Sequence, residues 1–290
     1  MSHLAQLKQQ IKAIQTTQKI THAIRLVSMS LYTKLEKGNK PLTLYTSKIR
    51  GVFSQLVRST PEWKNHILFP GDVFDATPLF IVVASSRGLC GSLNSNLSRY
   101  LERSLFIEEQ QTPRFITIGQ KALKWVRDYR KGEIICSYTD FNSHNYQTIA
   151  DNLVQQIMSV PTPYSSVAFF CTEFKTFFAQ RSRKVTLIPF TLDPLQEGSV
   201  NESDETDFIW EQEATPLLDY VAQQTVKTII SETLFQALLA EYASRFIAMD
   251  NSSTNAEKYL EKLTLAYNKM RQGLITKEVS ELSSGFLDIK

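Results

Sequence analysis

The chain has 290 residues, of which 42% are apolar and 21% charged. This composition supports a packed core and excludes a largely disordered protein. A formal net charge of +3 is too small to indicate nucleic-acid binding by itself. No apolar run reaches the roughly 18 residues of a membrane span, and the first residues lack the apolar stretch of a signal peptide.

The cysteines and histidines form no pattern typical of a site. There are three cysteines and four histidines. The cysteines are far apart and show no CxxC spacing, so we expect no disulfide framework, no metal, no cofactor and a reducing compartment. The histidines are equally scattered, which disfavours a shared metal. These residues are Cys90, Cys136, Cys171, His3, His22, His66 and His144.

Glycine and proline are absent from both ends of the chain, over Met1 to Lys37 and over Leu217 to Gln272. Helix interiors exclude these residues, because Gly costs about 1 kcal/mol there and Pro about 3 kcal/mol. Apolar residues recur in both ends at alternating spacings of three and four, as in the seam of a coiled coil. The positions are Leu4, Leu7, Ile11 and Ile14 in the first segment and Leu260, Leu263, Tyr267, Met270 and Leu274 in the last.

The expected helices are too long for a compact globule. At 1.5 Å per residue, helices of about 55 and 65 residues would span about 80 and 100 Å. A globule of this chain length would be roughly 50 Å across. We therefore predict that the N- and C-terminal helices form an antiparallel coiled-coil rod.

The middle of the chain alternates short apolar strands with helices, which is typical of an α/β domain on a mostly parallel, Rossmann-like sheet. The predicted organisation is an N-terminal coiled-coil helix over 1–60, an α/β domain over 61–213 at the foot of the rod, and a C-terminal coiled-coil helix over 214–290. Residues 197–213 carry seven acids and are expected to form a solvated loop. The predicted strands are 78–84, 114–118, 134–138, 167–171 and 185–190, and the predicted helices are 92–104, 120–129 and 147–159.

Charge is segregated along the chain. Residues 1 to 58 carry ten Lys and Arg against the single acid Glu36. The charges alone allow three interpretations of this basic helix. Its basic face is exposed to solvent, binds an acidic protein partner, or binds nucleic acid.

The turn from Ser85 to Asn94 is the segment that most resembles a catalytic or phosphate-binding loop, because it is rich in Gly and enters a helix. It matches neither the dinucleotide fingerprint nor a Walker A loop. Cys90 has no histidine near it in sequence that could activate its thiol. We interpret Arg87, Gly88, Cys90 and Gly91 as a structural turn and predict a non-enzymatic protein.

Several motifs together resemble the γ subunit of F-type ATP synthases. Thr17 to Ile24 is close to that family's T-Q-K-I-T-K-A-M, and Arg87 to Asn94 to its R-G-L-C-G-G-L-N. Tyr267 to Thr276 is similar to Y-N-K-A-R-Q-A-S-I-T, and Arg245 to Met249 to A-R-M-V-A-M. The resemblance covers nearly the whole chain and is weaker in the middle domain.

The resemblance implies a central rotary shaft without catalytic residues of its own. Its coiled coil would occupy the cavity of an α3β3 hexamer, and its foot would lie with ε on the c-ring. Rotation of the ring would turn the shaft and drive the catalytic sites through their conformations for ATP synthesis. It also implies a peripheral position on the cytoplasmic face of a bacterial inner membrane, with no nucleic-acid partner.

Residue roles carry over only where the motifs match. Arg271, Gln272 and Thr276 correspond to positions that touch the acidic catch loops of β, and Lys19 and Ile24 to positions in the bearing. Phe208 and Glu211 align loosely with the foot loop that meets the c-ring or ε.

Some positions depart from the family pattern. Residues 38–41 (Gly-Asn-Lys-Pro) interrupt the first helix, so we predict a bend there. Asp250 stands where the family usually has Lys, Tyr242 where it has His or Gln, and Gly273 where it has Ala. These departures leave open a γ paralogue in a specialised rotary ATPase, and a basic coiled-coil nucleic-acid-binding or scaffold protein is the more distant alternative.

Overall fold

A computed structural model describes residues 2–70, 77–107, 112–129, 132–159, 164–192 and 214–287. The chain divides into two compact units, each considered by itself. Unit 1 comprises Met1–Met29 and Arg245–Lys290, and unit 2 comprises Ser30–Ser244. These units differ from the zones predicted along the sequence, because parts of both terminal helices belong to each unit. Among the described residues, no helix is both long and apolar enough to cross a membrane.

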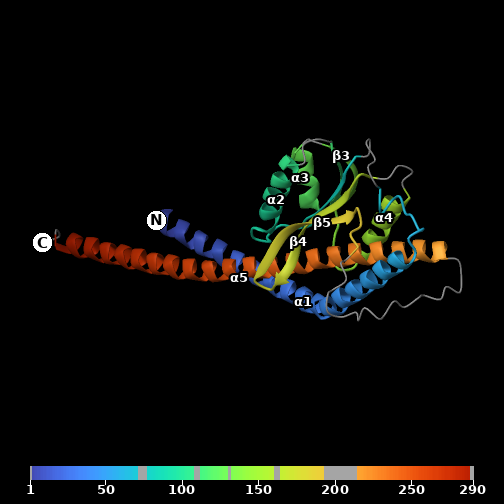
Figure 1. Ribbon diagram of the computed structural model, residues 1–290. Helices are drawn as coiled ribbons and strands as arrows, with labels where there is room; N and C mark the ends of the chain where they lie inside the picture. The colour runs from blue at the N-terminus through green and yellow to red at the C-terminus, as the bar shows by residue number, and fades with distance from the viewer. Residues whose placement is uncertain are drawn as a thin grey trace. The chain divides into compact units, whose positions relative to one another are not determined.

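Unit 2 is built on a five-stranded sheet in the order β3-β2-β1-β4-β5 (Figure 1). The first four strands in this order pair in parallel, and β5 pairs with β4 antiparallel. The mostly parallel α/β sheet predicted from the sequence is therefore confirmed. The strands are β1 (Leu79–Val83), β2 (Arg114–Ile118), β3 (Glu133–Tyr138), β4 (Val167–Thr176) and β5 (Ala179–Ile188).

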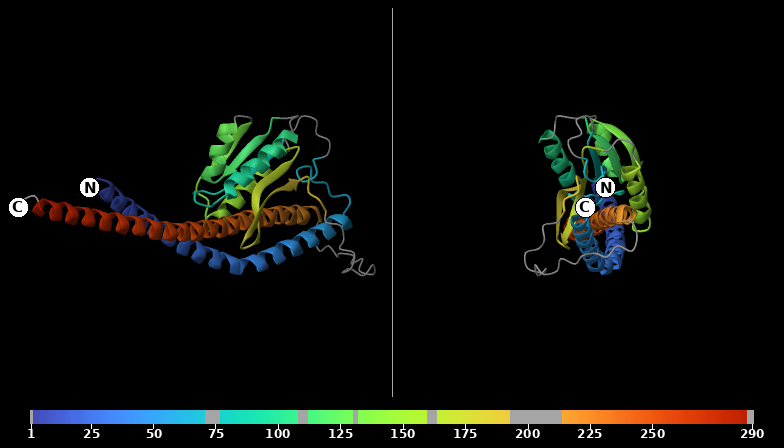
Figure 2. Two further views of the ribbon diagram at one scale, coloured as in Figure 1. Left: turned by 90° about the vertical axis from the view of Figure 1, so that its left-hand side faces the viewer. Right: turned by 45° about the vertical axis from the view of Figure 1, so that its right-hand side comes forward.

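Helices cover both faces of this sheet. Helices α2 (Leu93–Ile107) and α3 (Gln120–Tyr129) pack on one face, against side chains such as Phe80 and Phe170. On the other face lie α4 (Tyr146–Met158) and the parts of α1 (Ser2–Ser59) and α5 (Ala214–Leu287) that belong to unit 2. Strand β1 is an unbroken apolar run whose five residues are all buried, as expected for a central strand with both faces covered. Figure 2 shows the helices on either side of the sheet.

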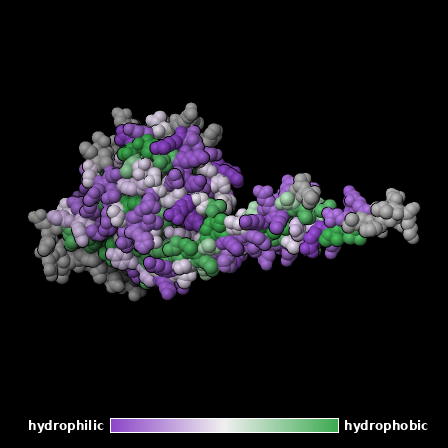
Figure 3. All heavy atoms as spheres, turned by 180° about the vertical axis from the view of Figure 1, so that it is seen from behind, coloured by the Kyte–Doolittle hydropathy of each residue, from purple (hydrophilic) through white to green (hydrophobic). Residues whose placement is uncertain are grey.

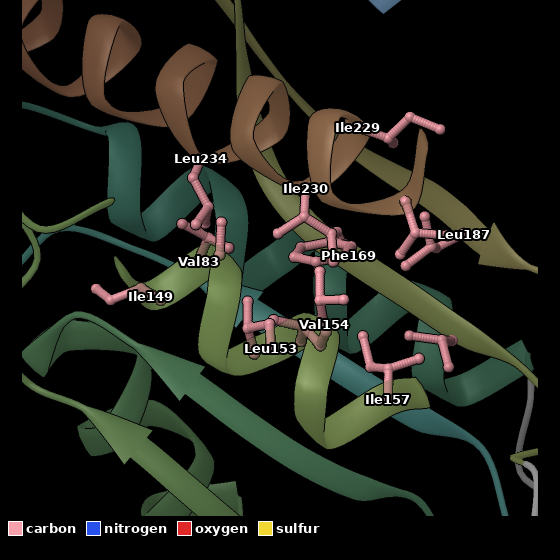
Figure 4. Packing of buried hydrophobic residues seen from close by; sticks show 14 of the residues in the cluster. Val83, Ile149, Leu153, Val154, Ile157, Phe169, Leu187, Ile229, Ile230 and Leu234 are labelled. Atoms are coloured by element: carbon pink, nitrogen blue, oxygen red, sulfur yellow. The ribbon is translucent and has the colours of Figure 1, made fainter. Parts of the chain in front are cut away.

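The larger core lies between the sheet, α4 and α5. Phe169 of β4 is fully buried and packs near Val154 of α4 and Ile230 of α5 (Figure 4). Burying apolar surface contributes about 25 cal/mol per Å² to stability, so this layer contributes much of the stability of unit 2. The first half of α5 is therefore a helix buried in the core of unit 2 and not one helix of a separate coiled coil.

The first helix does not end at residues 38–41, and the bend predicted there lies within one continuous helix. Helix α1 runs unbroken from Ser2 to Ser59 with Pro41 inside it. Its ribbon still changes direction in Figure 2 where dark blue gives way to lighter blue, as expected when a proline removes one hydrogen bond. Packing compensates for the loss, since Gly38 lies against Phe235 and Asn39 accepts a 2.6 Å hydrogen bond from Gln236.

The last strand begins earlier than the sequence indicates. β5 starts at Ala179, not near Val185, and forms a hairpin with β4. The turn at Phe177 and Phe178 carries none of the Gly, Pro, Asn or Asp residues that predict a hairpin. Phe177 instead holds the turn by packing its ring 4.8 Å from that of Tyr32, edge to face.

Unit 1 is a pair of antiparallel helical segments from α1 and α5, with both chain ends at the same end of the unit (Figure 1). Its buried apolar side chains in the described part are few: Leu7, Met249 and Leu263. Thr21 and Ser28 are also buried, and their hydroxyls donate to carbonyl oxygens of their own helix. The seam between the two segments therefore contains much less apolar surface than the core of unit 2.

Candidate partner-binding surfaces

The turn after β1 satisfies its polar groups internally. The side-chain oxygen of Asn94 accepts hydrogen bonds from the backbone N–H of Ser85 at 3.2 Å and from its hydroxyl at 3.1 Å. The thiol of Cys90 is buried and donates to the carbonyl oxygens of Arg87 and Gly88, at 3.5 and 3.4 Å. These contacts close the loop on itself and support a structural role.

Two backbone conformations make this turn tight. Gly91 has φ 57° and Leu89 has φ 65°, in the left-handed region that side chains larger than Gly rarely adopt. The side chain of Leu89 is 59% exposed. Sequence analysis missed Leu89, because only its backbone angle and its exposure distinguish it from an ordinary loop leucine.

The described part of the chain contains no cluster of three or more His, Cys, Asp or Glu residues that could hold a metal ion. Burial raises the pKa of the Cys171 thiol to about 12, so this thiol stays protonated and is a poor nucleophile at neutral pH. Burial likewise raises the pKa of Tyr138 to about 12.

The C-terminal part of α5 presents an exposed face in unit 1. Arg271, Gln272 and Thr276 are exposed and share one side of the helix with two apolar residues, Ile275 and Val279. Those two side chains are 51% and 59% exposed. The hydroxyl of Thr276 donates to the carbonyl of Gln272 at 2.9 Å, whereas the Arg271 side chain has no partner among the described residues. The face can therefore offer a free guanidinium beside apolar surface.

The α1 segment of unit 1 carries a second exposed surface. Lys19 is exposed and Ile24 is half-buried. Ile20 and Val27 flank Ile24 at helical spacing and are 54% and 60% exposed. Figure 3 shows such apolar side chains between hydrophilic ones on the helical pair of unit 1. Exposed apolar side chains in this number are typical of a surface that another protein covers.

A salt bridge joins the two segments of unit 1. Arg25 on α1 and Asp250 on α5 approach to 2.6 Å, and their side chains are 29% and 43% exposed. Asp250, which departs from the family pattern, is thus matched by a cation on the facing helix. The pair links the α1 and α5 segments of unit 1.

Five residues whose roles were predicted from the resemblance lie in unit 1. They are Lys19, Ile24, Arg271, Gln272 and Thr276. The residues of the Gly turn lie in unit 2. Phe208 and Glu211, together with the acidic loop 197–213, lie outside the described residues. An exposed aromatic residue that sequence analysis did not single out is Phe178, which is 82% exposed at the tip of the β4–β5 hairpin. Its sequence neighbours gave no turn signal that would have marked it as exposed.

Comparisons with known proteins give a consistent result. The family model described as ATP synthase matches residues 3–287. An ATP synthase gamma chain from Geobacter sp. (strain M21) is 30% identical over the full length of both chains. One from Acidithiobacillus ferrooxidans is 28% identical over 98% of this chain and 99% of its own length.

Solved structures share the fold at low identity. A chain of the mitochondrial ATP synthase of Euglena gracilis, solved as OSCP/F1/c-ring, aligns with TM-score 0.68 at 16% identity. The alignment covers 99% of this chain and 95% of that one. A rotor chain of the same organism's enzyme aligns with TM-score 0.63 at 17% identity, over 94% of this chain and 99% of that one.

Proposed function

Because the chain belongs to the ATP synthase γ chains, we propose that it is the central rotary shaft of an F-type ATP synthase. The observation that supports this most strongly is the extent of the family match, which spans both long helices and the α/β domain. The proposed partners are the α and β subunits of an α3β3 hexamer, the ε subunit and the c-ring.

In this proposal unit 1 works inside the hexamer. A shaft can change the conformation of a catalytic subunit only if it binds that subunit's states with different free energies. Unit 1 offers two chemically different surfaces for this purpose, one with Arg271 beside Ile275 and Val279, the other with Ile20 and Val27. As the shaft turns, each β subunit would meet these surfaces in succession.

Arg271 has the most specific of the proposed roles. Its exposed guanidinium would donate charge-assisted hydrogen bonds to the acidic catch loop of β, with Gln272 and Thr276 beside it. Lys19 and Ile24 would contribute to the bearing. Phe208 and Glu211 would contact the c-ring or ε.

The chain itself would be non-catalytic within a catalytic complex. Its Cys90 and Cys171 thiols are both buried, and its Gly turn is closed by its own side chains. The chemistry of ATP would be left to the α and β subunits. The proposed location is peripheral, on the cytoplasmic face of a bacterial inner membrane, held there by the complex.

The test is purification of the complex from the native source through an affinity tag on β, followed by identification of the subunits. Recovery of this chain with α, ε and c-ring subunits is the expected result. Absence of the chain from an otherwise complete complex would contradict the proposal. A strain carrying Arg271→Glu gives a matched comparison, because this change leaves the fold intact and should lower recovery or coupling only if Arg271 faces acidic loops.

A further inference from the structure

The carboxyl ends of β1 and β4 meet at the place where open α/β sheets hold their ligands. β1 continues into α2 on one face of the sheet, while β4 is reached from α4 on the other face. The helices that follow β1 and precede β4 thus lie on opposite faces of the sheet, as they do beside the ligand crevice of open α/β sheets. Here α5 closes the crevice, with Ala240 packed on Cys90 and Leu93 of the turn after β1.

The closure is incomplete and leaves a small internal cavity within unit 2. The cavity offers about 10 Å³ for the centre of a water molecule. One water requires about this much volume. All eight lining residues are at most 9% exposed, so the cavity is shielded from solvent. They are Val83, Ala84, Ser85, Leu93, Phe141, Thr172, Ala237 and Glu241.

One lining residue has an unsatisfied polar atom. Thr172 on β4 is 5% exposed, and its hydroxyl oxygen is buried without a hydrogen-bond partner in the described part of the chain. Buried hydroxyls in folded proteins almost always bond to protein or to an ordered water. An unsatisfied hydroxyl at a cavity of this size therefore points to a bound water.

A second polar group comes from the helix that closes the crevice. Glu241 on α5 is 6% exposed and lines the same cavity. Glu241 already has an interaction within the chain, but its two carboxyl oxygens can accept several hydrogen bonds, including one from a water that also serves Thr172. Ser85, the third polar residue, is already engaged with Asn94.

We propose that one ordered water occupies this cavity and bridges the hydroxyl of Thr172 and the carboxyl group of Glu241. The water joins the sheet to α5 where a nucleotide or cofactor would sit in a ligand-binding relative of this fold. A metal cation fits less well, because five of the eight lining residues are apolar and hard cations take six or more oxygen ligands. In a rotary shaft, this bridge would help fix the α/β domain to the helix that transmits rotation.

The test is a set of crystal structures of the full chain, at a resolution that shows ordered waters. The unsubstituted chain is compared with Thr172→Val, which removes the hydroxyl at nearly constant shape, and with Thr172→Ser, which keeps it. We expect one water within hydrogen-bond distance of residue 172 and of Glu241 in the unsubstituted chain and in Thr172→Ser. We expect its loss in Thr172→Val.

Three results would overturn the proposal. They are an empty cavity in the unsubstituted chain, a water that keeps its place and contacts in Thr172→Val, or a centre ringed by about six oxygen atoms at the short distances of a cation. Deuteron magnetic relaxation dispersion gives a solution readout, with one fewer long-lived water expected in Thr172→Val than in Thr172→Ser. Should Thr172→Val fail to fold, the other two structures still decide whether the water exists.

Discussion

The two units of this chain differ in how they are held together. Unit 2 has a continuous apolar core in which side chains from the sheet, α4 and α5 interlock, and residues such as Phe169 and Leu153 are fully buried. The described part of unit 1 buries only three apolar side chains, beside Thr21, Ser28 and Arg245. It also exposes many large apolar residues. These are Ile20, Leu26, Val27, Met29, Tyr259, Leu265, Ile275 and Val279.

Unit 2 is therefore stabilised by contacts within the chain, whereas unit 1 exposes apolar side chains that a partner would cover. A pair of helices with so small a seam derives little stability from packing, since most helical stability in proteins comes from an apolar face buried against other elements. The apolar residues that would strengthen such a seam point outward in unit 1. Substitutions in the two units should therefore differ in how strongly they change the stability of the free chain.

The largest effect is expected from truncating the core of unit 2. Phe169→Ala should lower the free energy of unfolding by about 3–5 kcal/mol, because it removes a fully buried ring and leaves a cavity. Leu263→Ala in unit 1 is the matched truncation and should cost less than about 2 kcal/mol, because few other buried side chains surround Leu263 and the two helical segments can close around the gap. Urea unfolding followed by circular dichroism measures both.

An equal or larger cost for Leu263→Ala would contradict the contrast between the units. It would mean that the helical pair contributes to global stability as much as the α/β core does.

The second effect is a loss of folding stability at high pH, which arises in unit 2. Burial raises the pKa of Cys171 to about 12, above its ordinary value of 9.0, so the folded chain retains a proton that the unfolded chain loses. Stability due to this thiol is present at neutral pH and is lost as the pH rises from about 9 to 12. The slope should approach about 1.4 kcal/mol per pH unit for one such group. Tyr138, whose pKa is also raised to about 12, adds a smaller loss that begins near pH 10, because its side chain is only partly buried and solvent screens it.

Substitution of Cys171 tests this assignment. Cys171→Ala should flatten the fall of unfolding free energy above pH 9, even though the smaller side chain lowers stability at neutral pH. Cys90→Ala serves as the control for removing a buried thiol elsewhere. An unchanged slope in Cys171→Ala would show that other groups cause the alkaline loss.

The third effect probes the seam of unit 1. The Arg25–Asp250 pair is part-exposed, so its coupling energy in a double-mutant cycle should be about 0.2–1 kcal/mol and should shrink with added salt. The cycle uses Arg25→Ala, Asp250→Ala and the double variant. A reversed pair, Arg25→Asp with Asp250→Arg, should restore most of the lost stability, and failure of this rescue would mean that the pair does not form.

The smallest effect on the free chain is expected at the exposed face of α5. Arg271→Glu should change the free energy of unfolding by no more than about 0.5 kcal/mol, because the side chain is exposed and has no partner in the described part of the chain. Binding to α3β3, measured by titration, should nevertheless weaken, while Lys277→Glu on another side of the helix should weaken it less. A stability loss of several kcal/mol in Arg271→Glu would assign the residue to the seam instead.

Local pattern predicted much of unit 2 correctly. The strand over Arg114–Ile118 and the helix over Gln120–Tyr129 have the predicted bounds, because Gly119 separates two strong and different periodicities. Gly119 has φ 89°, and a Cβ there would lie 2.0 Å from the carbonyl oxygen of Ala84, so its place is fixed by geometry as well. The change of periodicity is local and therefore readable from sequence, whereas the close approach to Ala84 is a tertiary contact that the sequence does not show.

Tertiary contacts explain the structural features that the sequence did not predict. Helix α1 continues through Pro41 because Gln236 of α5 donates hydrogen bonds to Asn39 before the proline and to Thr43 after it. The β4–β5 hairpin turns at two phenylalanines because Phe177 packs on Tyr32, far away in sequence. The residues proposed to face partners could not be predicted from pattern, since an exposed Arg271 looks like any solvated helix position and only the resemblance suggests a role for it.

The central claim is that this chain rotates inside a catalytic hexamer. It is tested most directly by assembling the chain with the α and β subunits of the same organism, fixing the hexamer to a surface and attaching a visible probe to the α/β domain. The account predicts that the probe turns in one direction when ATP is added, and that rotation ceases when ATP is withheld. ATP hydrolysis by a hexamer that contains the chain, with a probe that never turns, would contradict it.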